Sequence, residues 1–535
     1  MRFQDWINPY ATTRLPVFAR NVVATSQPLA AQAGLRILAQ GGNAVDAAVA
    51  TAAALALTEP VSNGLGSDCF ALVWDGARLH GLNASGPAPL AWNPAYFQRK
   101  HGGRMPERGW DSVTVPGAVA GWAALHQRFG KLAFDHVLAP AIEYAERGFA
   151  VSPIVQRKWA SQADNLRDHP GFAEHFLPRG RVPQVGEHFV LKDAAGTLRR
   201  IADTAGRDFY EGATAHKLVA HAQAHEAVLG LNDLRAYQPE WVTPIGRDFR
   251  GYTLHEIPPN GQGLAALIAL GILDHLDIAQ RPIDHPATQH LMIEAMKLAF
   301  ADVYAHVSDP RHSPVEPAAF LEDAYLAERA RRIDPQRAQT YTTGRAPSGG
   351  TVYLTTADQA GMMVSFIQSN YLGFGSGVVV PGTGVSLQNR GFGFTTEAGH
   401  PNQVAGGKRP FHTIIPAFLT HQGAPLMSFG VMGGNMQPQG QLQTLIRMLA
   451  FGQQPQAACD APRWKWNAGL CLEVEDGMPA PVTEGLLARG HKIQPPSHDY
   501  LDFGSGQFIW RLGDPAVEGY VAASDSRRDG QVAGF

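Results

Sequence analysis

The stretch "SGGTVYLTTADQAGMMVSFIQSN" (Ser348–Asn370) contains two runs in which apolar and polar residues alternate. Alternation with a period of two is typical of β-strands, so we predict strands over residues 351–357 and 362–369. The polar turn Asp358–Gly361 between them predicts a β-hairpin. Two glycines lead directly into Thr351, so a hydroxyl residue opens the first strand.

Thr351 and the glycine before it have ordinary explanations when each is taken alone, namely β propensity and a flexible loop end. Together they suit self-cleavage, because Gly350 tolerates the distorted backbone needed when the Thr351 hydroxyl attacks its own upstream carbonyl. Cleavage of the Gly350–Thr351 bond leaves an α-amine with a reference pKa of about 8, which can act as a base at neutral pH. Such a threonine is an activated nucleophile for acyl transfer, and we predict this role for Thr351.

A second glycine pair occurs in "FGVMGGNMQPQG" (residues 429–440). Residues 426–431 predict a strand, and a helix is predicted to start shortly after Gln437. Adjacent backbone N–H groups at such a turn can point at one developing negative charge, and loss of one donor typically costs about 3 kcal/mol. Gly433 and Gly434 are therefore candidates for an oxyanion hole, with a simple packing turn as the alternative.

The rest of the chain predicts helices and strands in layers. Residues 26–60 predict two helices, the second capped by Asn43 and buried on most sides, and Asp75-Gly76 predicts a hairpin. Buried helices of this kind pack against sheets. Further helices are predicted over residues 116–129, 141–149, 260–276 and 285–306, further strands over residues 377–380 and 413–419, and an exposed loop or linker over residues 311–348.

Composition narrows the class of protein. The chain has 535 residues, of which 45% are hydrophobic and 17% charged, and a formal net charge of -3. These values predict a soluble globular protein without nucleic-acid or membrane partners. Three scattered cysteines do not form a disulfide framework, and no apolar signal-peptide core or membrane-length segment is found, so we expect a cytoplasmic protein.

The sequence contains no motif typical of a metal site or of a nucleotide-binding site. There is no HExxH and no close carboxylate cluster, and the glycine-rich residues 373–384 lack the spacing of a nucleotide-binding loop. We therefore expect neither a metal nor a cofactor.

The chain resembles the γ-glutamyltranspeptidase family of N-terminal nucleophile hydrolases over nearly its whole length. Its blocks stand in family order and include "GGNAVDAAVA" (Gly41–Ala50), "VTVPGAVAGW" (Val113–Trp122) and "GVMGGNMQPQGQLQ" (Gly430–Gln443). The resemblance implies an α+β fold, a four-layer αββα sandwich, formed by a proenzyme that cuts itself. The large subunit would be residues 1–350 and the small subunit residues 351–535, and a dimer of such heterodimers is one assembly that the resemblance allows.

The resemblance also implies roles for single residues. Thr351 matches the nucleophile of the family, and Ser369 stands where the family has a threonine hydrogen-bonded to that nucleophile. Gly433 and Gly434 match the glycine pair of the oxyanion hole. The assignments of Thr351, Gly433 and Gly434 agree with those drawn from the residues alone.

Substrate recognition departs from the family pattern. The arginine that holds the glutamyl α-carboxylate is replaced by Asn83, in "NASGP", and two assisting serines are replaced by His412 and Thr413, in "KRPFHTIIP". An acidic residue that holds the α-ammonium becomes Gly393. Arg390 and His412 are candidates to supply the missing positive charge, with a structural arginine and a satisfied interior histidine as the alternatives.

The expected function is a self-cleaving amidohydrolase or acyltransferase of γ-glutamyltranspeptidase type, acting on a small amide or γ-glutamyl compound through an ester on Thr351. A cephalosporin or glutaryl acylase-like amidohydrolase without γ-glutamyl activity is one alternative, and a non-catalytic member that keeps the fold is another. No long lid is predicted around residues 393–403. Hydrolysis is therefore preferred over transfer, because an acceptor must compete with water in an open site.

Overall fold

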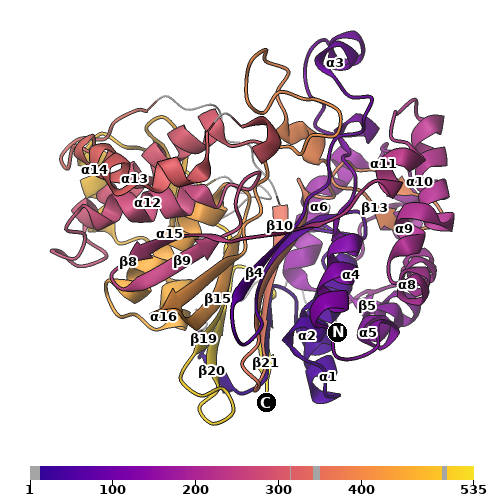
Figure 1. Cartoon of the computed structure of the whole chain (residues 1–535), viewed down its shortest axis with the longest axis horizontal. Coiled ribbons are helices and arrows are strands. Elements are labelled where there is room, and N and C mark those ends of the chain that lie inside the picture. The colour runs from indigo at the N-terminus through magenta and orange to yellow at the C-terminus, as the bar shows by residue number, and fades with distance from the viewer. Residues whose placement is uncertain (1–12, 314, 342–349, 497–502) are drawn as a thin grey trace.

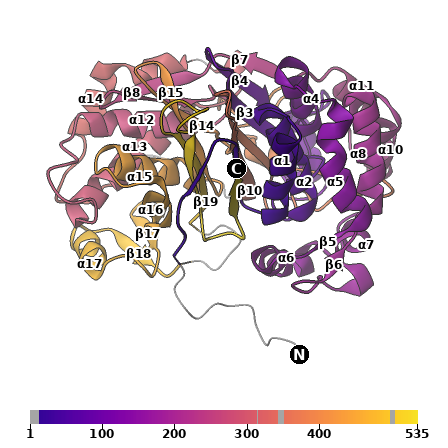
Figure 2. The same cartoon turned by 90° about the horizontal axis from the view of Figure 1, so that it is seen from below.

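Two stacked β-sheets form the centre of the molecule. The computed structural model describes residues 13–313, 315–341, 350–496 and 503–535. Both sheets are seven-stranded, and helices cover the outer face of each, so that the layers run helix, sheet, sheet, helix (Figure 1, Figure 2). The predicted αββα sandwich is confirmed.

The first sheet carries the predicted hairpin at its centre. Its strands, all antiparallel to their neighbours, are in spatial order β21 (Gln531–Gly534), β2 (Val22–Thr25), β10 (Gly350–Ala357), β11 (Met363–Tyr371), β3 (Asp68–Trp74), β4 (Leu79–Ala84) and β7 (Glu240–Val242). Asp358 closes the turn between β10 and β11 by accepting the N–H of Gly361. The hairpin predicted at Asp75-Gly76 is the β3–β4 pair.

The second sheet faces the first and is also antiparallel throughout. Its order is β1 (Val17–Ala19), β20 (Tyr520–Ser524), β19 (Ser505–Arg511), β15 (Ala424–Met432), β14 (Ala417–His421), β9 (Tyr252–Glu256) and β8 (Ile245–Phe249). Apolar side chains from both sheets, among them Phe70, Tyr353 and Phe418, fill the space between them. Each sheet contains strands from before residue 350 and strands from after it.

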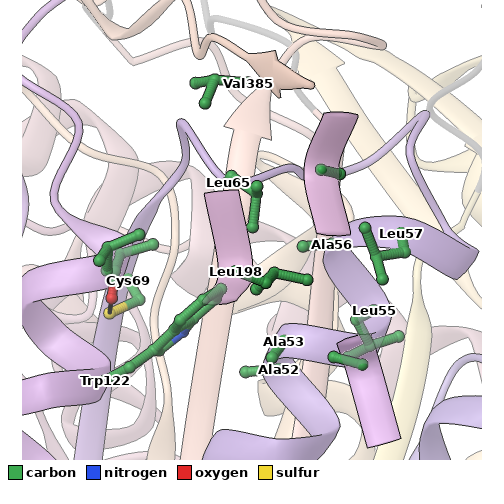
Figure 3. Packing of buried hydrophobic residues seen from close by; sticks show 14 of the residues in the cluster. Ala52, Ala53, Leu55, Ala56, Leu57, Leu65, Cys69, Trp122, Leu198 and Val385 are labelled. Carbon is green, nitrogen blue, oxygen red and sulfur yellow. Dashed lines mark hydrogen bonds between the residues drawn. The ribbon is translucent and has the colours of Figure 1, made fainter. Parts of the chain in front are cut away.

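Helices rich in small apolar residues cover the first sheet. They are α1 (Pro28–Ala39), α2 (Ala44–Thr58), α4 (Ala118–Phe129) and α5 (Phe134–Arg147). Every residue of α2 is buried, and Asn43 caps it by accepting the N–H of Asp46 at 2.9 Å, as predicted. The alanines of α2 let neighbouring elements approach closely, and Trp122 of α4 and Leu198 pack in the same cluster (Figure 3).

A further group of helices lies outside α2 and α5 (Figure 2). It comprises α6 (Pro153–Leu166), α7 (Phe172–Phe176), α8 (Lys192–Thr204), α9 (Arg207–Glu211), α10 (Ala213–Ala224) and α11 (Leu231–Arg235). The sequence analysis did not predict these helices. α3 (Pro94–His101) projects at one end of the sandwich (Figure 1).

The second sheet is covered by helices from both parts of the chain. They are α12 (Leu264–Asp274), α13 (Pro286–His306), α14 (Asp323–Arg331), α15 (Met436–Leu449), α16 (Pro455–Asp460) and α17 (Ala480–Ala488). A small sheet of β16 (Trp464–Ala468), β17 (Cys471–Val474) and β18 (Lys492–Gln494) lies beside them. Within the described residues, no helix is both long and apolar enough to cross a bilayer.

Some predicted elements have different bounds. The helix predicted over residues 141–149 is α5, which begins at Phe134. The strand predicted over residues 413–419 begins at Ala417, because the residues before it form a loop at the candidate site. The predicted loop or linker over residues 311–348 is wrong in part, because it contains α14, whose Leu326 packs into the helix layer. Residues 314 and 342–348 of this prediction lie outside the described residues.

Candidate active site

Thr351 lies at the start of β10 and is almost fully buried, with 2% of its surface exposed. The register between β10 and β11 shifts between Gly350 and Val352, so Thr351 lies at a β-bulge. Bulges re-aim a side chain out of the regular alternation of a strand. Thr351 Oγ1 donates to Ser369 Oγ at 3.4 Å and accepts from the side-chain amide of Gln437 at 3.3 Å.

The glycine pair forms the predicted strand-to-helix turn between β15 and α15. Gly433 and Gly434 have φ angles of 127° and 59°, in the region that favours glycine. Gln437 ties this turn to Thr351, because its side chain donates to Thr351 and its N–H donates to the Gly434 carbonyl at 3.2 Å. Gln262 donates to the same carbonyl at 3.0 Å. The turn therefore lies beside the candidate nucleophile.

Arg390 lies at the same site, in the short helix η5 (Arg390–Gly393), and is fully buried. Its Nη2 donates to Ser369 Oγ at 2.8 Å, and its Nη1 donates to Thr413 Oγ1 at 2.9 Å. The guanidinium stacks 4.5 Å from the ring centre of Tyr371, a residue held at a φ of 78°. The structure thus joins Thr351, Ser369, Arg390 and Thr413 in one hydrogen-bonded network.

Burial lowers the pKa of Arg390 to about 10, so the side chain is still a cation at neutral pH. Among the described residues its Nε has no hydrogen-bond partner, and the Asp68 carboxylate is 3.9 Å from it. A buried cation is costly unless an anion and hydrogen bonds compensate it.

Asp68 is a member of this network that the sequence analysis did not select. It opens β3, is fully buried, and contacts His412 Nε2 at 3.1 Å. Its other oxygen accepts the N–H of Gly117 at 3.2 Å. Burial raises the pKa of Asp68 to about 7, against the opposing effect of Arg390. An acidic residue opening a strand as apolar as "DCFALVW" is the signal that could have identified it.

His412 is neutral in this environment. It is fully buried, and burial together with the nearby Arg390 cation holds its pKa well below the ordinary value. The ring also makes an edge contact with Phe70, with centroids 4.8 Å apart. Of the two candidates for the missing positive charge, Arg390 is the cation and His412 is a satisfied interior histidine.

The side chain of Asn83 forms its hydrogen bonds with residues outside the Thr351 network. Its amide nitrogen donates to Asn260 at 3.0 Å, and its amide oxygen accepts from the Ser85 hydroxyl at 2.7 Å. Asn260 in turn donates to the Pro410 carbonyl at 2.7 Å. These bonds brace the loops beside the site, and none of them reaches Thr351.

Gly393 leaves no room for an acidic side chain. A Cβ placed on it would lie 2.8 Å from the carbonyl oxygen of Phe411, closer than real contacts allow. In the uncleaved chain, Thr351, Ser369 and Arg390 are each 2% exposed or less. The expected open site concerns the cleaved form and stays a prediction.

A separate buried cluster combines potential metal ligands with a lysine. His290 and Glu294 of α13 meet His491, with ligand atoms all within 4.8 Å of one another. The ammonium of Lys297 donates to Glu294 at 2.6 Å, and His290 lies 2.8 Å from His491. Lys297 therefore places the positive charge beside the carboxylate, as a metal ion would.

Comparison with known proteins identifies a family and several similar chains. The family model described as gamma-glutamyltranspeptidase matches residues 30–535. The glutathione hydrolase-like YwrD proenzyme of Bacillus subtilis is 37% identical, covering 96% of this chain and 98% of its own. The oxamate amidohydrolase proenzyme of Klebsiella pneumoniae is 36% identical, covering 95% and 97%. The crystal structure of cephalosporin acylase from Bacillus halodurans superposes with a TM-score of 0.95 at 47% identity, over 100% of this chain and 99% of the other.

Proposed function

The chain belongs to the gamma-glutamyltranspeptidase family, and on that premise we propose that it is a self-cleaving amidohydrolase whose nucleophile is Thr351. The observation that carries the proposal is the contact of Thr351 Oγ1 with Ser369 and Gln437, next to the turn of Gly433 and Gly434. The fold is that of N-terminal nucleophile hydrolases, since it matches the acylase structure over the whole chain.

The proposed reaction begins when Thr351 Oγ1 attacks the Gly350 carbonyl, and the hydroxyl proton passes to the displaced amide nitrogen, which becomes the α-amine of Thr351. Water then hydrolyses the resulting ester, which divides the chain into residues 1–350 and 351–535. The α-amine of Thr351 then takes the proton of its own hydroxyl as Oγ1 attacks the substrate carbonyl. The N–H groups of Gly433 and Gly434 hold the resulting oxyanion. The C–N bond breaks, the amine leaves with the proton, and an ester on Thr351 remains.

Water or an amine then attacks the ester, releases the acyl group and restores the hydroxyl. Ser369 orients Thr351 during both steps, because it is hydrogen-bonded to Oγ1 and is itself fixed by Arg390 and by the N–H of Tyr371 at 2.7 Å. Analysis of the products distinguishes hydrolysis from transfer to an amine.

Two classes of acyl group are candidates. A γ-glutamyl-like group follows from the family and from the name of the Bacillus subtilis relative. An acyl group without the α-amino function follows from the names of the amidohydrolase and acylase relatives. The second class is favoured by Asn83 and Gly393, which leave the α-ammonium and α-carboxylate of a glutamyl group without the partners that the family pattern supplies.

Mass spectrometry of the purified protein tests self-cleavage. We expect two polypeptides, the smaller beginning at Thr351, and a single inactive polypeptide for Thr351→Ala. Thr356→Ala, on the same strand but bonded to the Ala44 carbonyl at 2.6 Å, is the control and should still cleave. Cleavage of the Thr351→Ala protein at the same bond would refute the assignment, and an uncleaved wild-type protein would favour a non-catalytic member of the family.

A further inference from the structure

Arg390 carries a positive charge that the residues around it do not fully compensate. The hydrogen bonds described for its guanidinium go to the neutral hydroxyls of Ser369 and Thr413. The carboxylate of Asp68 stays 3.9 Å from Nε and is shared with His412. A guanidinium has five N–H donors in a planar fork, so it retains donors for a further anion.

The Arg390 guanidinium lies close to Thr351 Oγ1, the atom that carries the acyl group in the proposed reaction. The contacts of Ser369 with Thr351 (3.4 Å) and with Arg390 (2.8 Å) keep the guanidinium within about 6 Å of the attacking oxygen. An acyl group joined as an ester to Thr351 Oγ1 therefore starts within about 6 Å of the guanidinium. A carboxylate a few carbon atoms from the scissile carbonyl can reach it and form a charge-assisted, bidentate pair.

An α-ammonium on the same acyl group has no comparable partner. Asp68 is the acidic residue in the described network, and its oxygens are engaged with His412 and with the N–H groups of Gly86 and Gly117. Gly393 contributes no acid, and the Arg390 cation repels a second positive charge at short range. The charges of the site thus suit an acid without an amino group.

We propose that Arg390 determines specificity by binding a carboxylate of the acyl group, so that the substrates are monoamides of short dicarboxylic acids and not γ-glutamyl compounds. This inference rests on the proposed function, in which Thr351 carries the acyl group. It assigns to Arg390 a direct contact with substrate in addition to its contact with Ser369.

Three anilides test the proposal with the wild-type enzyme. Glutaryl anilide carries the carboxylate, γ-glutamyl anilide adds an α-ammonium, and pentanoyl anilide lacks both charges. We expect kcat/KM for glutaryl anilide to exceed the other two values by about tenfold or more, the range of a charge-assisted pair. Equal turnover of pentanoyl anilide, or faster turnover of γ-glutamyl anilide, would overturn the inference while leaving Thr351 as the nucleophile.

Arg390→Gln separates recognition from positioning. If Arg390 binds the carboxylate, the ratio of glutaryl to pentanoyl turnover falls toward one, and Arg390→Lys restores part of it. If Arg390 only positions Ser369, both rates fall together and the ratio is unchanged, which contradicts the proposal.

Inhibition of the wild-type enzyme gives a measurement that needs no variant to fold. Glutarate should compete at concentrations about tenfold or more below those of pentanoate and L-glutamate. Comparable inhibition by all three acids would contradict the role of Arg390. Failure of the underlying function is recognised separately, because then no anilide is turned over and the chain is not cleaved.

Discussion

The two buried charge clusters of this molecule differ in how completely their charges are compensated. In the cluster around α13, the Glu294 carboxylate accepts three hydrogen bonds. The donors are the Lys297 ammonium at 2.6 Å, the Tyr341 hydroxyl at 3.0 Å and the Gln339 N–H at 3.2 Å. In the cluster beside Thr351, the closest acid to Arg390 Nε is 3.9 Å away. The carboxylate of the first cluster is compensated within the protein, although His491 Nδ1 has no hydrogen-bond partner among the described residues. The cation of the second cluster is the group that we propose binds a carboxylate of the substrate.

Among the substitutions that test this comparison, Lys297→Met is expected to lower the free energy of unfolding the most. The substitution leaves the fully buried Glu294 without its cation, and breaking a buried pair in this way costs about 3–5 kcal/mol. Denaturant unfolding of the variant measures the loss, with the exposed Lys492→Met as the control at below about 0.5 kcal/mol. A stable Lys297→Met protein would mean that the cluster around α13 does not depend on its ion pair.

A second, smaller effect concerns pH. Because the pKa of Asp68 is raised to about 7 in the folded protein, the native state keeps a proton that the unfolded chain loses above about pH 4. The contribution of Asp68 to the free energy of unfolding is therefore present in full below about pH 4 and is lost as the pH rises to about 7. The stability difference between wild type and Asp68→Asn should change by up to about 1.4 kcal/mol per pH unit in this window.

Asp525→Asn is the control for the pH prediction. The pKa of Asp525 is lowered to about 2 despite its burial, because Arg527 and Arg463 lie beside it. Its contribution is present above about pH 4 and is lost only at lower pH, so the difference between wild type and this variant should stay flat from pH 4.5 to 7.5. A flat profile for Asp68→Asn as well would show that its carboxyl is ionised throughout.

The smallest effects compare two tyrosines, one from each cluster. The Tyr341 hydroxyl donates to Glu294, and hydrogen bonds to charged groups are worth about 1.5–3 kcal/mol, so Tyr341→Phe should destabilise by that amount. The buried Tyr371 hydroxyl has no partner within the described residues, so Tyr371→Phe should leave the free energy of unfolding within about 1 kcal/mol of wild type. Thermal or denaturant unfolding measures the stability of both variants. Equal losses of stability would contradict the difference that we describe between the two clusters.

The elements of this fold were predictable where local patterns are strong. The β10–β11 hairpin, the capped helix α2 and the glycine turn at Gly433 each carry a short-range signal, from alternation, capping and glycine. Between α5 and β7, α7, α9 and α11 are only five residues long and depend on packing, so they carry little local signal. The longer α6, α8 and α10 were also missed, although α8 buries residues at helical spacing, such as Ala194, Leu198 and Ile201.

The candidate site was predictable only in part, for a similar reason. Thr351, Ser369 and the glycines follow from the hairpin, the turn and the family resemblance. The joining of Asp68, Arg390 and His412 depends on contacts between residues more than 300 positions apart, such as the one between Asp68 and His412. The hydrogen bond between Asn83 and Asn260 is likewise a long-range contact, which the spacing of residues along the chain does not predict.

The order of strands determines what would hold the two polypeptides together after the proposed cleavage before Thr351. β10 pairs with β2, β11 pairs with β3, and β14 pairs with β9. Each of these strand pairs joins a strand from before Thr351 to a strand from after it. Two separately made pieces would each lack the strands that complete its sheets. We therefore expect the two polypeptides of the proposed cleaved form to unfold together in one cooperative transition and not to exchange partners without unfolding.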